Sequence, residues 1–186
     1  MTHAFVVVEG LSGTGKTTLA RLLAEALGGA YLSTPVEPYA SLREQIDLTA
    51  APAERYAFYL ASVAGAGREV SRLRPSGPVV CDRWLPTTQV WHSLLNVAVL
   101  PDVAFLELPE PDAILLVTCD DAARQARLDE RGRDANDLAE AVGSRERQLL
   151  AGYRALGFPE VDTTALSPGA AASEALEALR RAGVTR

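Results

Sequence analysis

A glycine-rich segment near the N-terminus restricts the fold of this chain more than any other feature of the sequence. Residues 10–17 read Gly-Leu-Ser-Gly-Thr-Gly-Lys-Thr, which fits the pattern G-x-x-x-x-G-K-[ST]. An apolar run rich in β-branched residues, 4–8, precedes the segment, and apolar residues recur at helical spacing over 16–27. Strand, glycine loop and helix in this order form the phosphate-binding start of an α/β unit.

The chemistry of this loop predicts that it binds ATP or GTP together with Mg²⁺. Glycines let successive backbone N–H groups face phosphate oxygens, and the helix that follows contributes the positive end of its dipole. Lys16, the single lysine among 18 basic residues, can reach the β- and γ-phosphates, and the Thr17 hydroxyl can ligate Mg²⁺. We expect this nucleotide, ATP or GTP, to be held by Gly10, Ser12, Gly13, Thr14, Gly15, Lys16, Thr17 and Thr18.

Composition agrees with a folded chain and argues against several classes of partner. The 186 residues are 48% hydrophobic and 23% charged, which is enough to bury a core in one domain, residues 1–186. A net charge of −6 disfavours binding to nucleic acid or to an anionic membrane. No apolar run approaches the ~20 residues of a membrane span, and the N-terminus lacks the charged start of a signal peptide. We therefore expect a soluble cytoplasmic protein. Two cysteines, Cys81 and Cys119, are too few for a disulfide framework.

The rest of the chain alternates strand-like and helix-like segments. Further strands are expected at 30–33, 78–81 and 114–117, with a weaker one at 160–163. Helices are expected at 52–73 and 125–130, over a long stretch that ends near residue 156, and at 170–181. This alternation predicts an α/β fold with a parallel sheet that helices cover on both faces, in three layers.

Asp82 and Arg83 directly follow the expected third strand. Ligands of open α/β sheets bind at the carboxyl edge of the strands, where these two side chains are expected to lie. Asp82 could hold Mg²⁺ through water, and Arg83 could grip an anionic substrate with two hydrogen bonds. A surface ion pair is the alternative, and the nearby phosphate loop favours the functional interpretation.

An arginine-rich stretch, which includes Arg124, Arg127, Arg131 and Arg133, is the third group with functional potential. Phosphoryl transfer spreads negative charge over the moving group, so arginines on a glycine-hinged lid can close over it. We place this lid at about 131–137 and predict Arg131 and Arg133 as catalytic. For Arg124, a solvated helix face is the favoured interpretation.

Other candidate residues keep two interpretations each. Glu37 could face the acceptor site or could be an ordinary turn carboxylate. Tyr59 and Trp91 could stack on a base or belong to the core. His92 could bond a base or a sugar, although a solvent-facing histidine is favoured. Glu9 could support the site or cap a local structure.

Taken together and in order, these motifs resemble the thymidylate kinase family of P-loop nucleoside monophosphate kinases. The similar segments cover nearly the whole chain and are 8–18, 37–38, 81–84, 127–133 and 162–164. The resemblance implies a five-stranded parallel sheet, ATP with Mg²⁺, and transfer of the γ-phosphoryl group to a nucleoside monophosphate, dTMP or a related nucleotide. It also implies that Arg83 grips the acceptor, that the lid supplies a catalytic arginine, and that the protein forms a homodimer.

The sequence departs from that family at several positions, and two further hypotheses follow. Ser12 stands where the family has a loop Asp, residues 60–64 lack Arg and Gln, and Trp91 replaces a common Tyr. The second hypothesis is a kinase for a neutral hydroxyl of a nucleoside or small metabolite, with Glu37 or Asp82 as general base. The third, less favoured, is a nucleotide-binding switch module.

Overall fold

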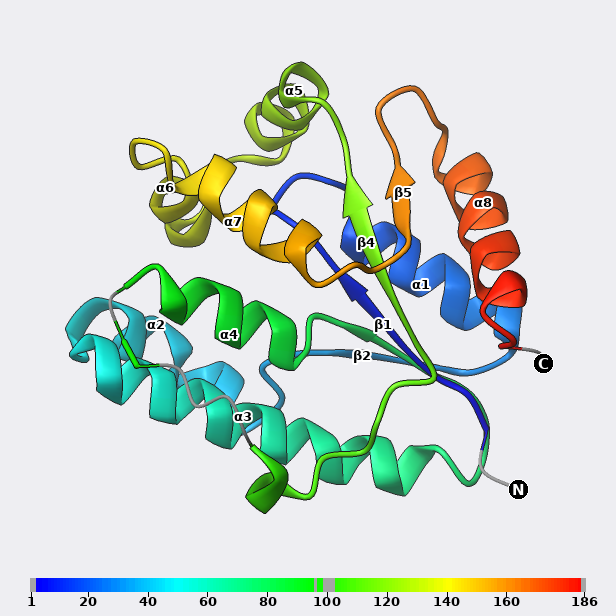
Figure 1. The fold of residues 1–186 in the computed structure, drawn as a ribbon, viewed down its shortest axis with the longest axis horizontal. Helices are drawn as coiled ribbons and strands as arrows, with labels where there is room; N and C mark the ends of the chain where they lie inside the picture. Colours follow the sequence, from blue (N-terminus) through cyan, green and yellow to red (C-terminus); the bar gives the residue numbers. More distant parts are fainter. Residues whose placement is uncertain (1–2, 96, 99–102, 185–186) are drawn as a thin grey trace.

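The computed structural model describes residues 3–95, 97–98 and 103–184, which form a parallel sheet between layers of helices (Figure 1). The strands are β1 (Phe5–Glu9), β2 (Ala30–Ser33), β3 (Val79–Asp82), β4 (Ala113–Thr118) and β5 (Glu160–Asp162). Their order in the sheet is β2-β3-β1-β4-β5, and neighbouring strands are paired in parallel. The expected α/β fold with a five-stranded parallel sheet is therefore confirmed.

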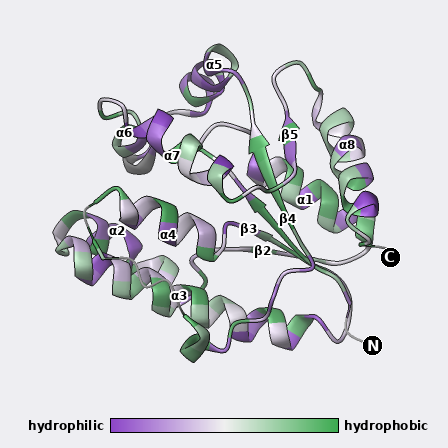
Figure 2. Cartoon of the chain, viewed as in Figure 1, coloured by the Kyte–Doolittle hydropathy of each residue, from purple (hydrophilic) through white to green (hydrophobic). Residues whose placement is uncertain are grey.

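The central strand β1 is buried along its whole length, which explains its continuous run of apolar residues. Successive side chains of a strand point to opposite faces, so Val6 and Val8 contribute to one core cluster while Phe5 and Val7 contribute to another. Figure 2 shows the same hydrophobic character along β1 and β4. Since β1 is held from both sides, the loop that follows it starts from a rigid position.

Helices cover the two faces of the sheet. On one face lie α1 (Lys16–Leu27) and α8 (Pro168–Arg181), and on the other lie α3 (Pro52–Leu73), α4 (Leu85–Ser93) and α7 (Arg145–Ala155). Two more helices, α5 (Asp121–Arg131) and α6 (Ala135–Glu140), lie beyond the carboxyl end of β4 (Figure 1). Within the described ranges, no helix has the length and apolar character needed to cross a membrane.

Several helices differ from the sequence-based expectation. The sequence did not predict α2 (Tyr39–Thr49), α4 or the short 3-10 helix at Ala104–Leu106. Helix α2 contains no buried residue, and its apolar residues at helical spacing, Tyr39, Leu42 and Ile46, form only a narrow stripe among polar neighbours. The expected long helix ending near residue 156 is wrong, because a turn at 141–144 separates α6 from α7. Helix α5 begins earlier than expected, because the carboxylate of Asp120 accepts a hydrogen bond from the backbone N–H of Ala123 at 2.7 Å.

The turn between α1 and β2 supplies a stability test. A Cβ added at Gly29 would lie 2.2 Å from the carbonyl oxygen of Pro78, which also accepts the backbone N–H of Ala30 at 2.8 Å. Gly29→Ala must push β2 away from the start of β3. We expect a loss of about 1–3 kcal/mol, which lowers the thermal midpoint by roughly 2–12 °C. Gly169→Ala is the matched control, because nothing lies within 4 Å of its added Cβ. Circular dichroism during heating measures the two midpoints. Equal midpoints for the two variants would contradict the close approach of Gly29 to Pro78.

Candidate functional site

The loop between β1 and α1 wraps around its own lysine. Gly13 and Gly15 have φ values of 80° and 91°, which only glycine adopts without strain. Lys16 is 6% exposed, and its Nζ donates a hydrogen bond to the carbonyl oxygen of Leu11 at 2.6 Å. Burial, together with the positive charge of Arg83, lowers the pKa of Lys16 to about 8. The lysine thus lies inside the loop with its ammonium group at the loop's inner surface.

The loop also has the geometry of a phosphate cradle. A Cβ at Gly10 would lie 2.3 Å from the carbonyl oxygen of Val117, and one at Gly13 would lie 2.8 Å from Cγ of Leu128. Side chains at either position would therefore displace the loop. Beside it is a cavity of about 530 Å³ whose lining includes Lys16, Arg127 and Arg131. Three cations and a turn that admits only glycine suit a polyphosphate.

The predicted metal-binding residues lie in contact. The Thr17 hydroxyl donates to Oδ2 of Asp82 at 2.5 Å. Asp82 is 5% exposed, yet its Oδ1 has no hydrogen-bond partner within the part of the chain that the structure describes. A hydroxyl and an unpartnered carboxylate oxygen are the hard oxygen ligands that Mg²⁺ prefers. The donor set at this position therefore fits the ion.

Arg83 is held at the end of β3 and points toward the loop. Its backbone has a left-handed φ of 70°, and its N–H donates to the carbonyl oxygen of Val8 at 3.0 Å. Its guanidinium donates to the Gly10 carbonyl oxygen at 3.2 Å and to the Ser12 hydroxyl at 3.4 Å. Burial alone would lower the pKa of Arg83, but the surrounding acidic groups, which include the Glu140 carboxylate, have a larger effect and raise this pKa. Arg83 therefore stays charged in its partly buried position.

Glu9 fixes the turn that carries Arg83. Its carboxylate is fully buried and accepts the backbone N–H groups of Trp84 at 2.8 Å and Thr87 at 3.3 Å, at the start of α4. The Thr87 hydroxyl also bonds this carboxylate and lies 2.9 Å from the hydroxyl of Tyr153. Burial raises the pKa of Glu9 to about 7. Of the two interpretations that the sequence left open, the structure shows the cap, because Glu9 binds the N-terminus of α4, and the same hydrogen bonds hold the turn that carries Arg83.

Helix α6 brings an unexpected carboxylate to the loop. Glu140 is 1% exposed and accepts hydrogen bonds from the backbone N–H of Ser12 at 2.9 Å and from its hydroxyl at 3.0 Å. The same carboxylate lies 3.7 Å from Arg83 and 3.7 Å from Arg124. The prediction that Arg124 lies on a solvated face is wrong. It is 2% exposed, pairs with Glu146, and donates to the carbonyl oxygen of Ser12 at 3.2 Å.

The two predicted lid arginines occupy different places. Arg131 lines the cavity beside the loop, and its guanidinium donates to Oδ2 of Asp137 at 2.6 Å. Arg133 is outside the lining of that cavity and donates to Asp129 at 2.7 Å and to Gln125 at 2.6 Å. In this arrangement Arg131 lines the cavity beside the loop, whereas Arg133 is hydrogen-bonded to two side chains of α5.

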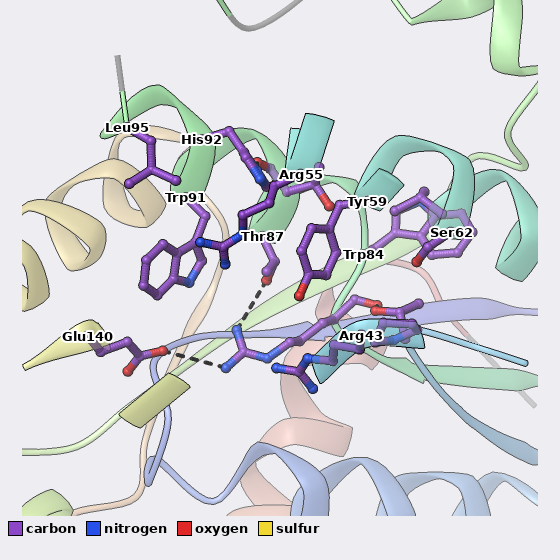
Figure 3. Close-up of a pocket in the computed structure, with 15 residues that line it drawn as sticks. Arg43, Arg55, Tyr59, Ser62, Trp84, Thr87, Trp91, His92, Leu95 and Glu140 are labelled. Atoms are coloured by element: carbon purple, nitrogen blue, oxygen red, sulfur yellow. Dashed lines mark hydrogen bonds and ion pairs between the residues drawn. The ribbon is translucent and has the colours of Figure 1, made fainter. Parts of the chain in front are cut away.

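A second cavity, of about 60 Å³, lies between α3, α4 and the end of β3 (Figure 3). Tyr59 and Trp91 line it, as the stacking interpretation requires. His92 also lines it and is 3% exposed, so the expectation of a solvent-facing histidine is wrong. Glu37 lines neither of these two cavities. Its carboxylate is exposed and accepts a hydrogen bond from the Ser41 hydroxyl at 2.6 Å. Arg43 and Arg55 also line this cavity, and the sequence analysis did not identify them. Nothing in their own segments distinguishes them from surface arginines.

The two cavities adjoin each other. Thr34, Arg43 and Arg83 appear in the lining of both. The loop residues and Asp82 therefore face one side of Arg83, while the aromatic side chains face the other. A parallel sheet of this order, with a glycine loop after its central strand and Asp82 beside Thr17, defines a P-loop nucleotide-binding protein.

Comparisons with known proteins agree with this class. Residues 5–165 match the family model described as an AAA domain. The thymidylate kinase of Xylella fastidiosa strain M12 is 32% identical over 145 residues, which are 70% of this chain and 65% of that protein. The enzyme of strain Temecula1 is also 32% identical, with 68% of its length covered. A structure of thymidylate kinase from Candida albicans superposes with a TM-score of 0.74 at 16% identity and covers 98% of this chain and 93% of that one.

The chain therefore belongs to the family described by the AAA domain model and, among P-loop proteins, to the thymidylate kinase family. It spans about 65% of the length of the Xylella fastidiosa strain M12 relative.

The raised pKa of Glu9 leads to a test of stability against pH. The folded state keeps a proton on Glu9 up to about pH 7, whereas the unfolded chain releases it near the ordinary pKa of 4.5. The stability that this proton contributes is lost as the pH rises through this window. Glu9→Gln has no such proton, so its unfolding free energy relative to the wild type should rise by up to about 3 kcal/mol between pH 4.5 and 8.

Urea unfolding at several pH values measures this difference. Glu110→Gln, at an exposed position, is the control and should follow the wild type at every pH. Parallel pH curves for Glu9→Gln and the wild type would contradict a buried carboxyl with a raised pKa.

Proposed function

We propose that this protein transfers the γ-phosphoryl group of ATP to a nucleoside monophosphate, dTMP or a related nucleotide. The observation that carries the proposal is the pair of adjoining cavities that meet at Arg43 and Arg83. One side has the features of a polyphosphate site, and the other has aromatic walls that suit a base. The relatives named thymidylate kinase support the same reaction.

The donor side can be assigned residue by residue. The N–H groups of the loop, residues 10–18, would surround the phosphates of ATP, and Lys16 would exchange the Leu11 carbonyl oxygen for phosphate oxygens. Thr17 and Asp82 would hold Mg²⁺, which neutralises charge on the phosphates when bound. A third cavity, of about 200 Å³, is lined by Gly15, Arg127 and Leu166 among others and would take the adenine end of ATP.

The acceptor side favours an anion over a neutral hydroxyl. Arg43 and Arg83 at the junction of the cavities would grip the phosphate of a monophosphate. An acceptor phosphate needs no general base. The competing hydroxyl kinase would need one, but Glu37 lies outside both cavities, and Asp82 lines only the donor cavity, where it would hold Mg²⁺ with Thr17. The acceptor cavity is narrow, at about 60 Å³, so its walls must move apart when a nucleotide enters.

The remaining expectations stay predictions. They are one kinase domain over residues 1–186, a lid at about 131–137 that closes over the transferred group, catalytic roles for Arg131 and Arg133, a homodimer and a cytoplasmic location.

A panel of phosphate acceptors tests the function. The wild-type protein with Mg-ATP should phosphorylate dTMP or a related monophosphate and leave thymidine unchanged. Lys16→Ala should form no product with any acceptor, because it removes the ammonium group that would contact the phosphates, and it should keep the wild-type circular dichroism spectrum. Lys16→Arg is the control that keeps the charge without the compact ammonium group. Product from nucleosides alone, or from Lys16→Ala at the wild-type rate, would overturn the proposal.

The lid is tested by Arg131→Ala. A guanidinium that stabilises the transferred group acts in the transition state, so kcat should fall by roughly 10²- to 10³-fold. The Kd for ATP, measured by calorimetry, should change only a few-fold. Arg133→Ala tests whether this side chain leaves Asp129 to act on the transferred group. Arg72→Ala, at an exposed i,i+3 pair with Glu69, is the control. An unchanged kcat for both lid variants would remove the lid from the mechanism.

A further inference from the structure

The Thr87 hydroxyl lies where three elements of the fold meet. Thr87 is in the first turn of α4, close to Arg83, whose Nη1 donates a hydrogen bond to Thr87 Oγ1 at 3.3 Å (Figure 3). The same oxygen is bonded to the carboxylate of Glu9 at the end of β1, and it lies 2.9 Å from the hydroxyl of Tyr153 on α7. One hydroxyl therefore connects Arg83 to the central strand and to the helix that follows α6.

The hydrogen-bonding capacity of this hydroxyl is fully used. A threonine hydroxyl offers one proton and two lone pairs, which matches the three side chains that contact Thr87 Oγ1. A guanidinium can only donate, so Arg83 takes one lone pair whatever the protonation state of Glu9. The other lone pair and the proton serve Glu9 and Tyr153, one of which donates while the other accepts. The three partners together therefore fix the direction of the Thr87 hydroxyl.

Tyr153 brings a buried hydroxyl to this point. Its side chain is fully buried, and its ring belongs to the core cluster that includes Leu11, Val90 and Leu149. Burial raises the pKa of Tyr153, so the hydroxyl keeps its proton. A buried hydroxyl without a partner is unfavourable, and Thr87 is the partner of this one. The packing of the ring therefore determines where the hydrogen bond to Thr87 is made.

The remaining contacts of the Arg83 guanidinium come from the glycine loop and from α6. It donates to the Gly10 carbonyl oxygen at 3.2 Å and to the Ser12 hydroxyl at 3.4 Å, and it lies 3.7 Å from the Glu140 carboxylate. Hydrogen bonds of this length are weaker than those near 2.9 Å, so several contacts together set the direction of the guanidinium. Thr87 lines the acceptor cavity, and its contact therefore holds the guanidinium from the acceptor side.

We propose that Thr87 and Tyr153 are positioning residues for the acceptor phosphate. Thr87 holds the guanidinium of Arg83 in the direction that meets this phosphate, and Tyr153 holds Thr87. This inference rests on the proposed function, because it assumes that Arg83 grips the acceptor. Since the chain of contacts ends at Arg83, its loss weakens the binding of a monophosphate and leaves the binding of ATP unchanged.

Steady-state kinetics of Thr87 variants test the first link, with dTMP as acceptor or whichever monophosphate the wild type phosphorylates best. Thr87→Val removes the hydroxyl and keeps the shape of the side chain. It should raise the KM for the monophosphate by roughly 2- to 12-fold, the effect of one hydrogen bond, and leave the KM for ATP unchanged. Thr87→Ser keeps a hydroxyl and should restore the wild-type KM. Thr49→Val, at an exposed position of α2, is the control.

Tyr153→Phe tests the second link, because it keeps the buried ring and removes only the hydroxyl. It should raise the KM for the monophosphate by no more than Thr87→Val does. Added to Thr87→Val, it should have no further effect, because Tyr153 acts through the Thr87 hydroxyl. Tyr31→Phe, on β2, is the control.

A double-mutant cycle separates positioning from a structural role. Arg83→Lys keeps the charge and lacks the planar guanidinium that reaches Thr87, so adding Thr87→Val to it should not lower kcat/KM for the monophosphate further. Equal losses in the wild-type and Arg83→Lys backgrounds, or an unchanged KM for the monophosphate in Thr87→Val, would overturn the inference, although the proposed function would stand. If the wild type phosphorylates no nucleoside monophosphate, the proposed function fails, and this assignment fails with it.

Discussion

The parallel pairing of β1 with β3 is the constraint on which the site depends. Val8 lies opposite Asp82 in the register, and the next N–H along β3, that of Arg83, still bonds the carbonyl oxygen of Val8. This register places Asp82 against Thr17 at the start of α1, and it turns Arg83 back toward the loop. A slip of one residue would move every side chain of β3 to the opposite face and would separate these groups. The buried apolar residues of β1 therefore determine the geometry of the polar site.

Electrostatic balance around the loop explains how an acidic protein can offer a site for phosphates. The net charge is −6, yet the buried Lys16 lies near the partly buried Arg83, where their like charges and the loss of water are unfavourable. Buried carboxylates offset this cost: Glu140 lies 3.7 Å from Arg83, and Asp82 and Glu140 raise the pKa of Lys16 against the effect of burial. Nearby carboxylates thus keep Lys16 and Arg83 charged. Any anion that binds must compete with these carboxylates for the N–H groups of the two cations.

The sequence was sufficient for the parts of the structure that depend on local patterns. The glycine loop, the buried strands and the long helix α3 each have a continuous signal within a short stretch of chain, and they lie where the patterns predicted them. The position of Glu140 could not be predicted, because it meets Ser12 across a separation of 128 residues from a helix of six residues. The burial of Arg124 and His92 was missed for the same reason. Each has a polar side chain whose partners come from other elements, so nothing in its own segment distinguishes it from a surface residue.

The two sides of the site are held together by different forces. On the donor side, β1 and α1 share a core of buried apolar residues, and separating them would expose that core to water. On the acceptor side, α2 has no buried residue, and its link to α3 includes Asp47, which binds Arg55 and Tyr59. Polar contacts of this kind can exchange for contacts with water or ligand at little net cost, whereas lost apolar burial is not recovered in this way. Helix α2 is also linked to α3 by the edge-to-face contact of Tyr39 with Phe58, at 5.7 Å between ring centroids, so the acceptor side combines polar links with one aromatic contact, whereas the donor side is held by a buried apolar core.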